Sequence, residues 1–124
     1  MSTTYSALGP STKLTHYLKA NDTLPSLTAT LQDSAGTALN LSTVSGITFT
    51  MKNLADNTLK INSATASIQS PASKGQVSYT FTSSDTDTAG TYLAEFELTY
   101  DNGSIFTVPT QGALSVVILE DYNG

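Results

Sequence analysis

Residues 87–108 read Asp-Thr-Ala-Gly-Thr-Tyr-Leu-Ala-Glu-Phe-Glu-Leu-Thr-Tyr-Asp-Asn-Gly-Ser-Ile-Phe-Thr-Val. From Thr91 to Tyr100 the even positions hold Tyr, Ala, Phe, Leu and Tyr, and the odd positions hold Thr, Leu, Glu, Glu and Thr. Alternation with a period of two residues predicts a strand with one buried face. The residues 101–103, Asp-Asn-Gly, tolerate positive φ and predict a turn, after which residues 105–108 return as the second strand of a hairpin.

The length of this turn decides the register of the hairpin. A two-residue Asn-Gly loop places Phe106 opposite Thr99, whereas a three-residue loop with a left-handed Gly103 places Phe106 opposite Leu98. A slip of one residue moves every side chain of a strand to the other face of the sheet. Because the large apolar Phe106 belongs in the core, we expect the three-residue loop.

The segment that leads into the strand, residues 89–94, reads Ala-Gly-Thr-Tyr-Leu-Ala. It is similar to the tyrosine corner of immunoglobulin-like sandwiches, in which a Tyr lies two residues before a buried position that holds Cys in antibody domains. Here that position is Ala94, and the chain has no Cys. We therefore predict that Tyr92 is buried, with its hydroxyl group bonded to the backbone a few residues upstream.

The same alternation occurs along the rest of the chain. Apolar residues fall on every second position in the segments 27–31, 47–51, 77–81 and 114–118. The parity changes between Ile61 and Ala64, which predicts a bulge at residues 62–63, and residues 14–19 fit an edge strand that the Leu24-Pro25 pair stops. Short strands at regular spacing predict an all-β, antiparallel immunoglobulin-like β-sandwich of about seven to nine strands.

We divide the chain into three parts. Residues 14–120 are expected to form the sandwich, and residues 121–124 a short C-terminal tail. Residues 1–13 are rich in Ser and Thr and are expected to form an N-terminal arm that becomes ordered against a partner. The side chains with no place in the strand pattern are the candidate partner-binding residues, namely Tyr5, Leu8 and Tyr122.

The composition restricts the possible partners. Only 12% of the 124 residues are charged, 37 residues are Ser or Thr, and the net charge is −5. All five basic residues are Lys and they form no cluster, so we expect no binding to nucleic acid or to an anionic membrane.

The N-terminus lacks the charged and apolar regions of a secretory signal. We therefore expect synthesis and retention in the cytoplasm unless the protein leaves in a larger assembly.

Residues that could carry chemistry are few. His16 is the single histidine, and no Ser has the surroundings of a catalytic nucleophile. Glu95 and Glu97 have a spacing similar to that of glycosidase carboxylates, but they alternate with core residues and are expected on a solvated face. Asp85 and Asp87 fit turn formation better than a weak calcium site. We predict a protein that is not an enzyme and has no catalytic, cofactor-binding or metal-binding residues.

Several segments together resemble a recurring module of phage virions, the N-terminal domain of baseplate upper proteins. These segments begin with DTLPSL, TLQDSAG and LNLS, and continue with ITFTMK, GQVSY, DTAGTY, DNG and TVP, in that order over residues 14–120. The resemblance implies an immunoglobulin-like fold that is mounted on a tail, baseplate or neck. The chain ends at Gly124, without the downstream linker and receptor-binding parts of full-length baseplate proteins, which implies a separate small component.

This resemblance predicts a non-enzymatic structural protein of the virion, made in the host cytoplasm. Its expected partners are other phage structural proteins, which it meets in several copies in a symmetric assembly. The alternative is a domain of a secreted adhesin or a pilus-like surface protein, which ordinarily needs a signal sequence. A carbohydrate-binding module is a third possibility. It would need an exposed row of aromatic side chains, whereas the aromatic residues in the strand pattern have inward parity, which indicates core packing: Tyr79, Phe81, Tyr92, Phe96 and Tyr100.

Overall fold

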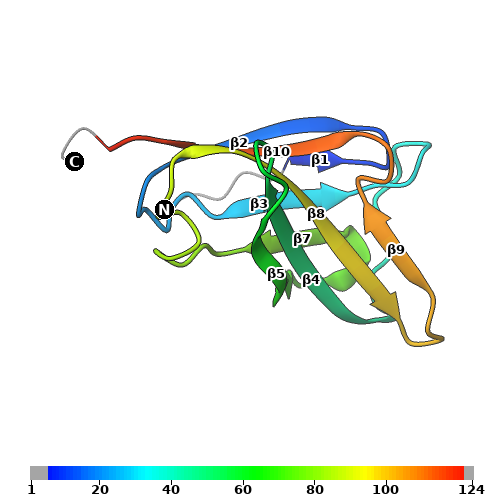
Figure 1. Cartoon of the computed structure of the whole chain (residues 1–124). Coiled ribbons are helices and arrows are strands. Elements are labelled where there is room, and N and C mark those ends of the chain that lie inside the picture. The colour runs from blue at the N-terminus through cyan, green and yellow to red at the C-terminus, as the bar shows by residue number, and fades with distance from the viewer. Residues whose placement is uncertain (1–5, 122–124) are drawn as a thin grey trace.

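The computed structural model describes residues 6–121, which form a β-sandwich of two packed sheets (Figure 1). The predicted all-β sandwich is confirmed. The elements are β1 (Ser6–Leu8), β2 (Lys13–Lys19), β3 (Leu27–Leu31), β4 (Val44–Asn53), β5 (Leu59–Thr65), β6 (Ser67–Ile68), a 3₁₀ turn η1 (Ala72–Lys74), β7 (Gln76–Tyr79), β8 (Gly90–Tyr100), β9 (Ile105–Val108) and β10 (Ala113–Leu119).

The larger sheet has the strand order β2-β10-β8-β4-β5, with β9 paired to β8. Strand β8 is the longest element and contacts β4 along one side; β10 and β9 lie along different halves of its other side (Figure 1). Phe106 lies opposite Leu98 and Val108 opposite Phe96. With Gly103 at φ 88°, the three-residue loop and its register are confirmed.

The smaller sheet has the order β1-β3-β7-β6. Strand β1 pairs parallel with β3, which places Leu8 opposite Leu31, and Leu8 is completely buried. The prediction that residues 1–13 form an arm is therefore wrong for residues 6–13, which belong to the sandwich. A three-residue strand in a Ser/Thr-rich segment carries no readable alternation, and its pairing with β3 is not visible in the local sequence.

The structure also corrects two details of the predicted sandwich. The described part of the chain has ten strands, rather than seven to nine, because β1 and the two-residue β6 were too short to predict. Two pairs are parallel, β1 with β3 and β2 with β10, whereas the other strand pairs are antiparallel. Between β1 and β2 the chain crosses from one sheet to the other through a turn in which Gly9 and Thr12 are hydrogen-bonded to each other.

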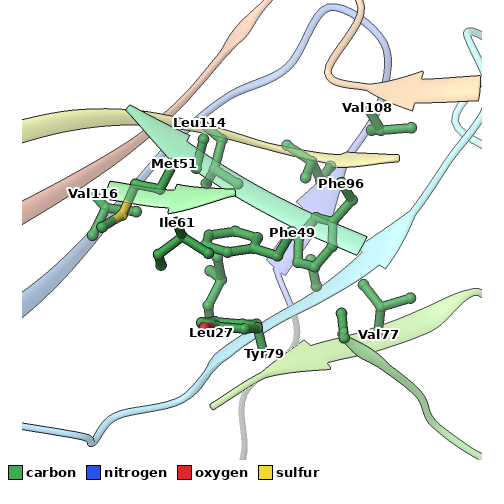
Figure 2. Close-up of a cluster of buried hydrophobic side chains, with 14 of the residues drawn as sticks. Leu27, Phe49, Met51, Ile61, Val77, Tyr79, Phe96, Val108, Leu114 and Val116 are labelled. Carbon is green, nitrogen blue, oxygen red and sulfur yellow. The ribbon is translucent and has the colours of Figure 1, made fainter. Parts of the chain in front are cut away.

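The core is built from the inner faces of both sheets. Phe49 of β4 lies at its centre, between Phe96 of the same sheet and Tyr79 of the other, with ring centroids 5.1 and 4.5 Å away (Figure 2). The bulge is confirmed: β5 shifts register between the partners of Phe49 and Met51, and Ser63 has φ 56°. Aromatic rings at these distances add directional contacts to the free energy of burial.

The predicted tyrosine corner is confirmed at the start of β8. Tyr92 is 1% exposed, and its hydroxyl group donates a hydrogen bond to the carbonyl of Thr88 at 2.7 Å. Burial raises the pKa of this tyrosine. The corner fixes the loop that leads into β8 to the core of the sandwich.

Candidate interaction surface

The outer face of the larger sheet carries apolar side chains that the core does not use. Along each strand, residues alternate between the core and this face. In β8, Leu93 lies between the buried Tyr92 and Ala94, and in β10, Val117 lies between the buried Val116 and Ile118. Six such residues form what we term the outer apolar face: Tyr17, Leu54, Leu59, Leu93, Val117 and Leu119.

The register of the strands places these six residues on one face of the sheet, with Thr91 and Lys52 between some of them. Tyr17 lies opposite Val117 on β10, and Val117 lies opposite Thr91 on β8. One step further along β8, Leu93 lies opposite Lys52, which lies opposite Leu59. Leu54, just after β4, donates its amide N–H to the carbonyl of Thr91 at 3.0 Å. The outer apolar face thus crosses the whole width of the sheet.

Several of these side chains are half exposed. Tyr17 is 58% exposed, and Leu54, Leu59 and Leu119 lie between 44% and 53%. Single exposed apolar side chains are normal, but several of them on one face are typical of a surface that contacts a partner. Ile105, at the far end of the same face on β9, is also exposed.

The charges on this face include both signs. Lys13, Lys19 and Lys52 project from it, as do Glu95 and Glu97, by the same alternation. These are three of the five lysines and two of the ten acidic residues, so the face has a net charge of +1 on a chain of net charge −5. Within the described chain, Lys52 forms no salt bridge with either glutamate.

A depression of about 330 Å³ opens on the same face. It lies where β8 changes its neighbour, because β10 pairs with β8 as far as Ala94 and β9 pairs with it from Phe96. The connection from β9 to β10 borders the depression. Its lining includes Thr50, Lys52, Leu59, Leu93, Glu95 and Thr110.

The structure corrects one of the three candidate partner-binding residues. Leu8 was predicted to contact a partner, but it is buried in the core between the sheets. Tyr5 and Tyr122 lie outside the described residues, and their role stays a prediction. The sequence did contain a signal for the outer apolar face, because Leu93 and Val117 are apolar at positions that the alternation assigns to the outside.

The other polar residues that were considered for chemistry have structural partners. The carboxylate of Asp85 accepts hydrogen bonds from the Tyr79 hydroxyl at 2.7 Å and the Thr82 amide at 2.9 Å. Asp87 forms a salt bridge with Lys60. The hydrogen bond from Lys60 lowers the pKa of Asp87, and the same bond raises the pKa of Lys60. Through these contacts, both aspartates connect the loop before β8 to neighbouring segments of the sandwich.

His16 lies on the inner face of β2. Its Nε2 atom donates to the carbonyl of Pro25 at 2.9 Å, and its ring stacks on Phe81 with centroids 5.8 Å apart. Burial lowers the pKa of His16, although the hydrogen bond to Pro25 opposes this effect. The neutral imidazole therefore fixes the loop between β2 and β3 to the sandwich.

The part of the chain that the structure describes, residues 6–121, contains neither a cluster of metal-ligating side chains nor a membrane-spanning helix. No group of three or more His, Cys, Asp or Glu side chains in that range is arranged to hold a metal ion. Over the same range, no helix has the length and apolar character needed to cross a membrane.

Comparison with known proteins gives a match in structure alone. No family model matches the chain, and no curated protein is similar to it in sequence. Among solved structures, the chain is similar to the N-terminal domain of phage TP901-1 ORF48, with a TM-score of 0.68 and 12% sequence identity. The match covers 93% of this chain and 96% of that one. The resemblance to a phage module is thereby confirmed for the fold.

Proposed function

We propose that this chain is a non-enzymatic structural protein of a bacteriophage virion, which docks on the tail, baseplate or neck as an attachment or scaffold module. The observation that carries the proposal is the similarity of fold to a phage domain, which extends over almost the full length of both chains. The order of the short sequence segments over residues 14–120 points to the same class of protein.

The outer apolar face supports a docking role. A face with six apolar side chains lowers the solubility of a free protein, and such faces are usually covered in an assembly. The low share of charged residues, 12%, fits a module whose surface contacts neighbouring proteins in an assembly. We therefore assign docking within the particle to the outer face of the larger sheet.

Several copies on a symmetric particle would strengthen a docking contact that is weak on its own. Each additional copy held on the same scaffold raises the effective concentration of its neighbours, so that modest contacts add up to a stable assembly. The partners in this proposal are other phage structural proteins.

The test is the protein content of purified particles. Virions are separated on a density gradient and their proteins are identified by mass spectrometry, with an antibody against the chain to locate it by electron microscopy. The proposal predicts that the chain co-purifies with the particles and that the label lies on the tail, baseplate or neck. If the chain is absent from particles and is found on the surface of bacterial cells, it belongs to the adhesin class instead.

A further inference from the structure

We propose that the partner on the outer apolar face is a second copy of this chain, bound around a two-fold axis so that Lys52 of each copy faces Glu95 of the other. The proposal rests on the surface to which docking is assigned above, and it names the occupant of that surface. Its test uses the purified chain alone, so it can fail while the role in the virion stands.

The first argument is the distribution of charge. A chain of net charge −5 repels its own copies over most of its surface. The outer face of the larger sheet is different, because its three lysines and two glutamates nearly cancel. Two copies therefore meet with the least repulsion through this face.

The second argument is the position of Lys52 and Glu95. Lys52 lies opposite Leu93 on β8, and Glu95 is two residues beyond Leu93 on the same strand and face. Lys52 and Glu95 therefore both adjoin Leu93 and are diagonal neighbours of each other, yet no salt bridge joins them in the described chain. Opposite charges that adjoin a shared apolar residue and are left unpaired within one copy can pair between two copies.

The third argument is the symmetry of such a contact. In a two-fold interface, the same surface of each subunit contacts its counterpart, so residue i contacts j and j contacts i. A two-fold axis that lies in the plane of the interface and runs between Lys52 and Glu95 passes close to Leu93. It brings Leu93 against its own copy and forms the Lys52–Glu95 contact twice, at the border of the depression that both residues line.

The test is a charge exchange, read by analytical ultracentrifugation of the purified full-length chain over a range of concentrations. The wild-type chain, of 13.0 kDa, is expected to reach twice this mass as its concentration rises. Lys52→Glu and Glu95→Lys, each alone, create like charges across the axis and should weaken association at least about tenfold. The double variant, with both changes, should restore it.

Two features of the design separate the proposed contact from a general effect of charge. Lys52→Glu lowers the net charge by two and Glu95→Lys raises it by two, so repulsion between whole molecules would move the two variants in opposite directions. Lys74→Glu, in the exposed 3₁₀ turn η1, makes the same chemical change away from this face and should leave association unchanged.

The proposal is overturned if the wild-type chain remains a monomer at all concentrations. It is also overturned if the double variant associates no better than the single variants, or if Lys74→Glu weakens association as much as Lys52→Glu does. Because Lys52 and Glu95 are both exposed, the variants should fold, and equal thermal midpoints would verify this.

Discussion

The outer faces of the two sheets differ in the side chains they present, although both enclose the same core. On the smaller sheet, the outward positions hold small or uncharged residues: Ala7, Thr28, Thr30, Ser67, Gln76 and Ser78. On the larger sheet, the outward positions hold the outer apolar face and five charged residues in addition to Ser and Thr residues such as Thr50 and Thr91. Of the six large apolar side chains that are exposed in the described residues, four lie on strands of the larger sheet and Leu54 lies in the turn directly after β4, whereas Leu24 lies in the loop before β3.

This difference between the two outer faces distinguishes the side chains that the fold needs from those that a partner would contact. The smaller sheet encloses its side of the core without large apolar side chains on its outer face. The apolar residues of the larger sheet are therefore not needed to bury the core, and they are best explained by contact with another molecule. The predictions below contrast residues of the core with residues of the outer apolar face.

The largest effect is expected at the tyrosine corner, on the inner face of β8. Tyr92→Ala removes a buried ring and should lower the free energy of unfolding by about 3–5 kcal/mol. Tyr92→Phe removes only the hydrogen bond to Thr88 and should lower it by about 1 kcal/mol. Urea denaturation measures both values. Small and equal losses would show that the corner does not stabilise the fold.

A loss of similar kind is expected at Leu8, in the edge strand of the smaller sheet. Because Leu8 is completely buried, Leu8→Ala should lower the free energy of unfolding by about 2–5 kcal/mol. A residue in an arm that only contacts a partner would leave this free energy unchanged. Thermal and urea denaturation of the isolated protein therefore decide between a core strand and an arm.

A smaller effect, which depends on pH, is expected at His16, the inner-face neighbour of Tyr17. Burial holds the pKa of His16 below its usual value of 6.5. As the pH falls below that value, the unfolded chain takes up a proton before the folded chain does, so the free energy of unfolding decreases. The contribution of neutral His16 to the free energy of unfolding is fully present above the pKa that His16 has in the unfolded chain. It is lost as the pH falls through the lower pKa of the folded chain.

The check on His16 is a series of urea denaturation curves between about pH 7 and pH 5, the range in which histidine titrates. The wild-type chain should lose stability over this range, and His16→Gln, which does not titrate there, should lose less. Identical pH profiles for the two chains would mean that His16 titrates alike in the folded and unfolded states.

The smallest change in stability is expected on the outer apolar face. Leu93→Ser should alter the free energy of unfolding by less than about 0.5–1 kcal/mol, because the side chain is only partly buried. The same variant should reduce incorporation into virions. Ser78→Ala, on the outer face of the smaller sheet, is the matched control and should assemble normally. A large loss of stability in Leu93→Ser would assign this residue to the fold instead.

The sequence predicted those parts of the fold that depend on local patterns. The hairpin of β8 and β9, its three-residue loop and the corner at Tyr92 all follow from alternation and turn residues within some twenty positions of one another. The bulge near Ser63 follows from a change of parity between Ile61 and Ala64. Each of these features could be predicted because neighbours in the chain determine it.

The features that were missed depend on contacts between distant segments. Leu8 becomes a core residue only because β1 pairs with β3, and three residues carry too little pattern to indicate this. The outer apolar face was visible only as isolated apolar residues, such as Leu93 and Val117, at outward positions. Their assembly into one surface depends on the registers of five strands, which no local pattern provides.

The central claim, that the outer apolar face is covered in the particle, can be tested most directly by hydroxyl-radical footprinting of the free protein, diluted until it is monomeric, and of purified virions. Tyr17, Leu59 and Leu119 are well exposed in the free chain, and Leu24, which is 49% exposed in a loop, is an internal control of similar exposure. We expect oxidation of the three face residues to fall strongly in virions while oxidation of Leu24 stays the same. Unchanged oxidation of all three face residues in virions that contain the chain would contradict the assignment.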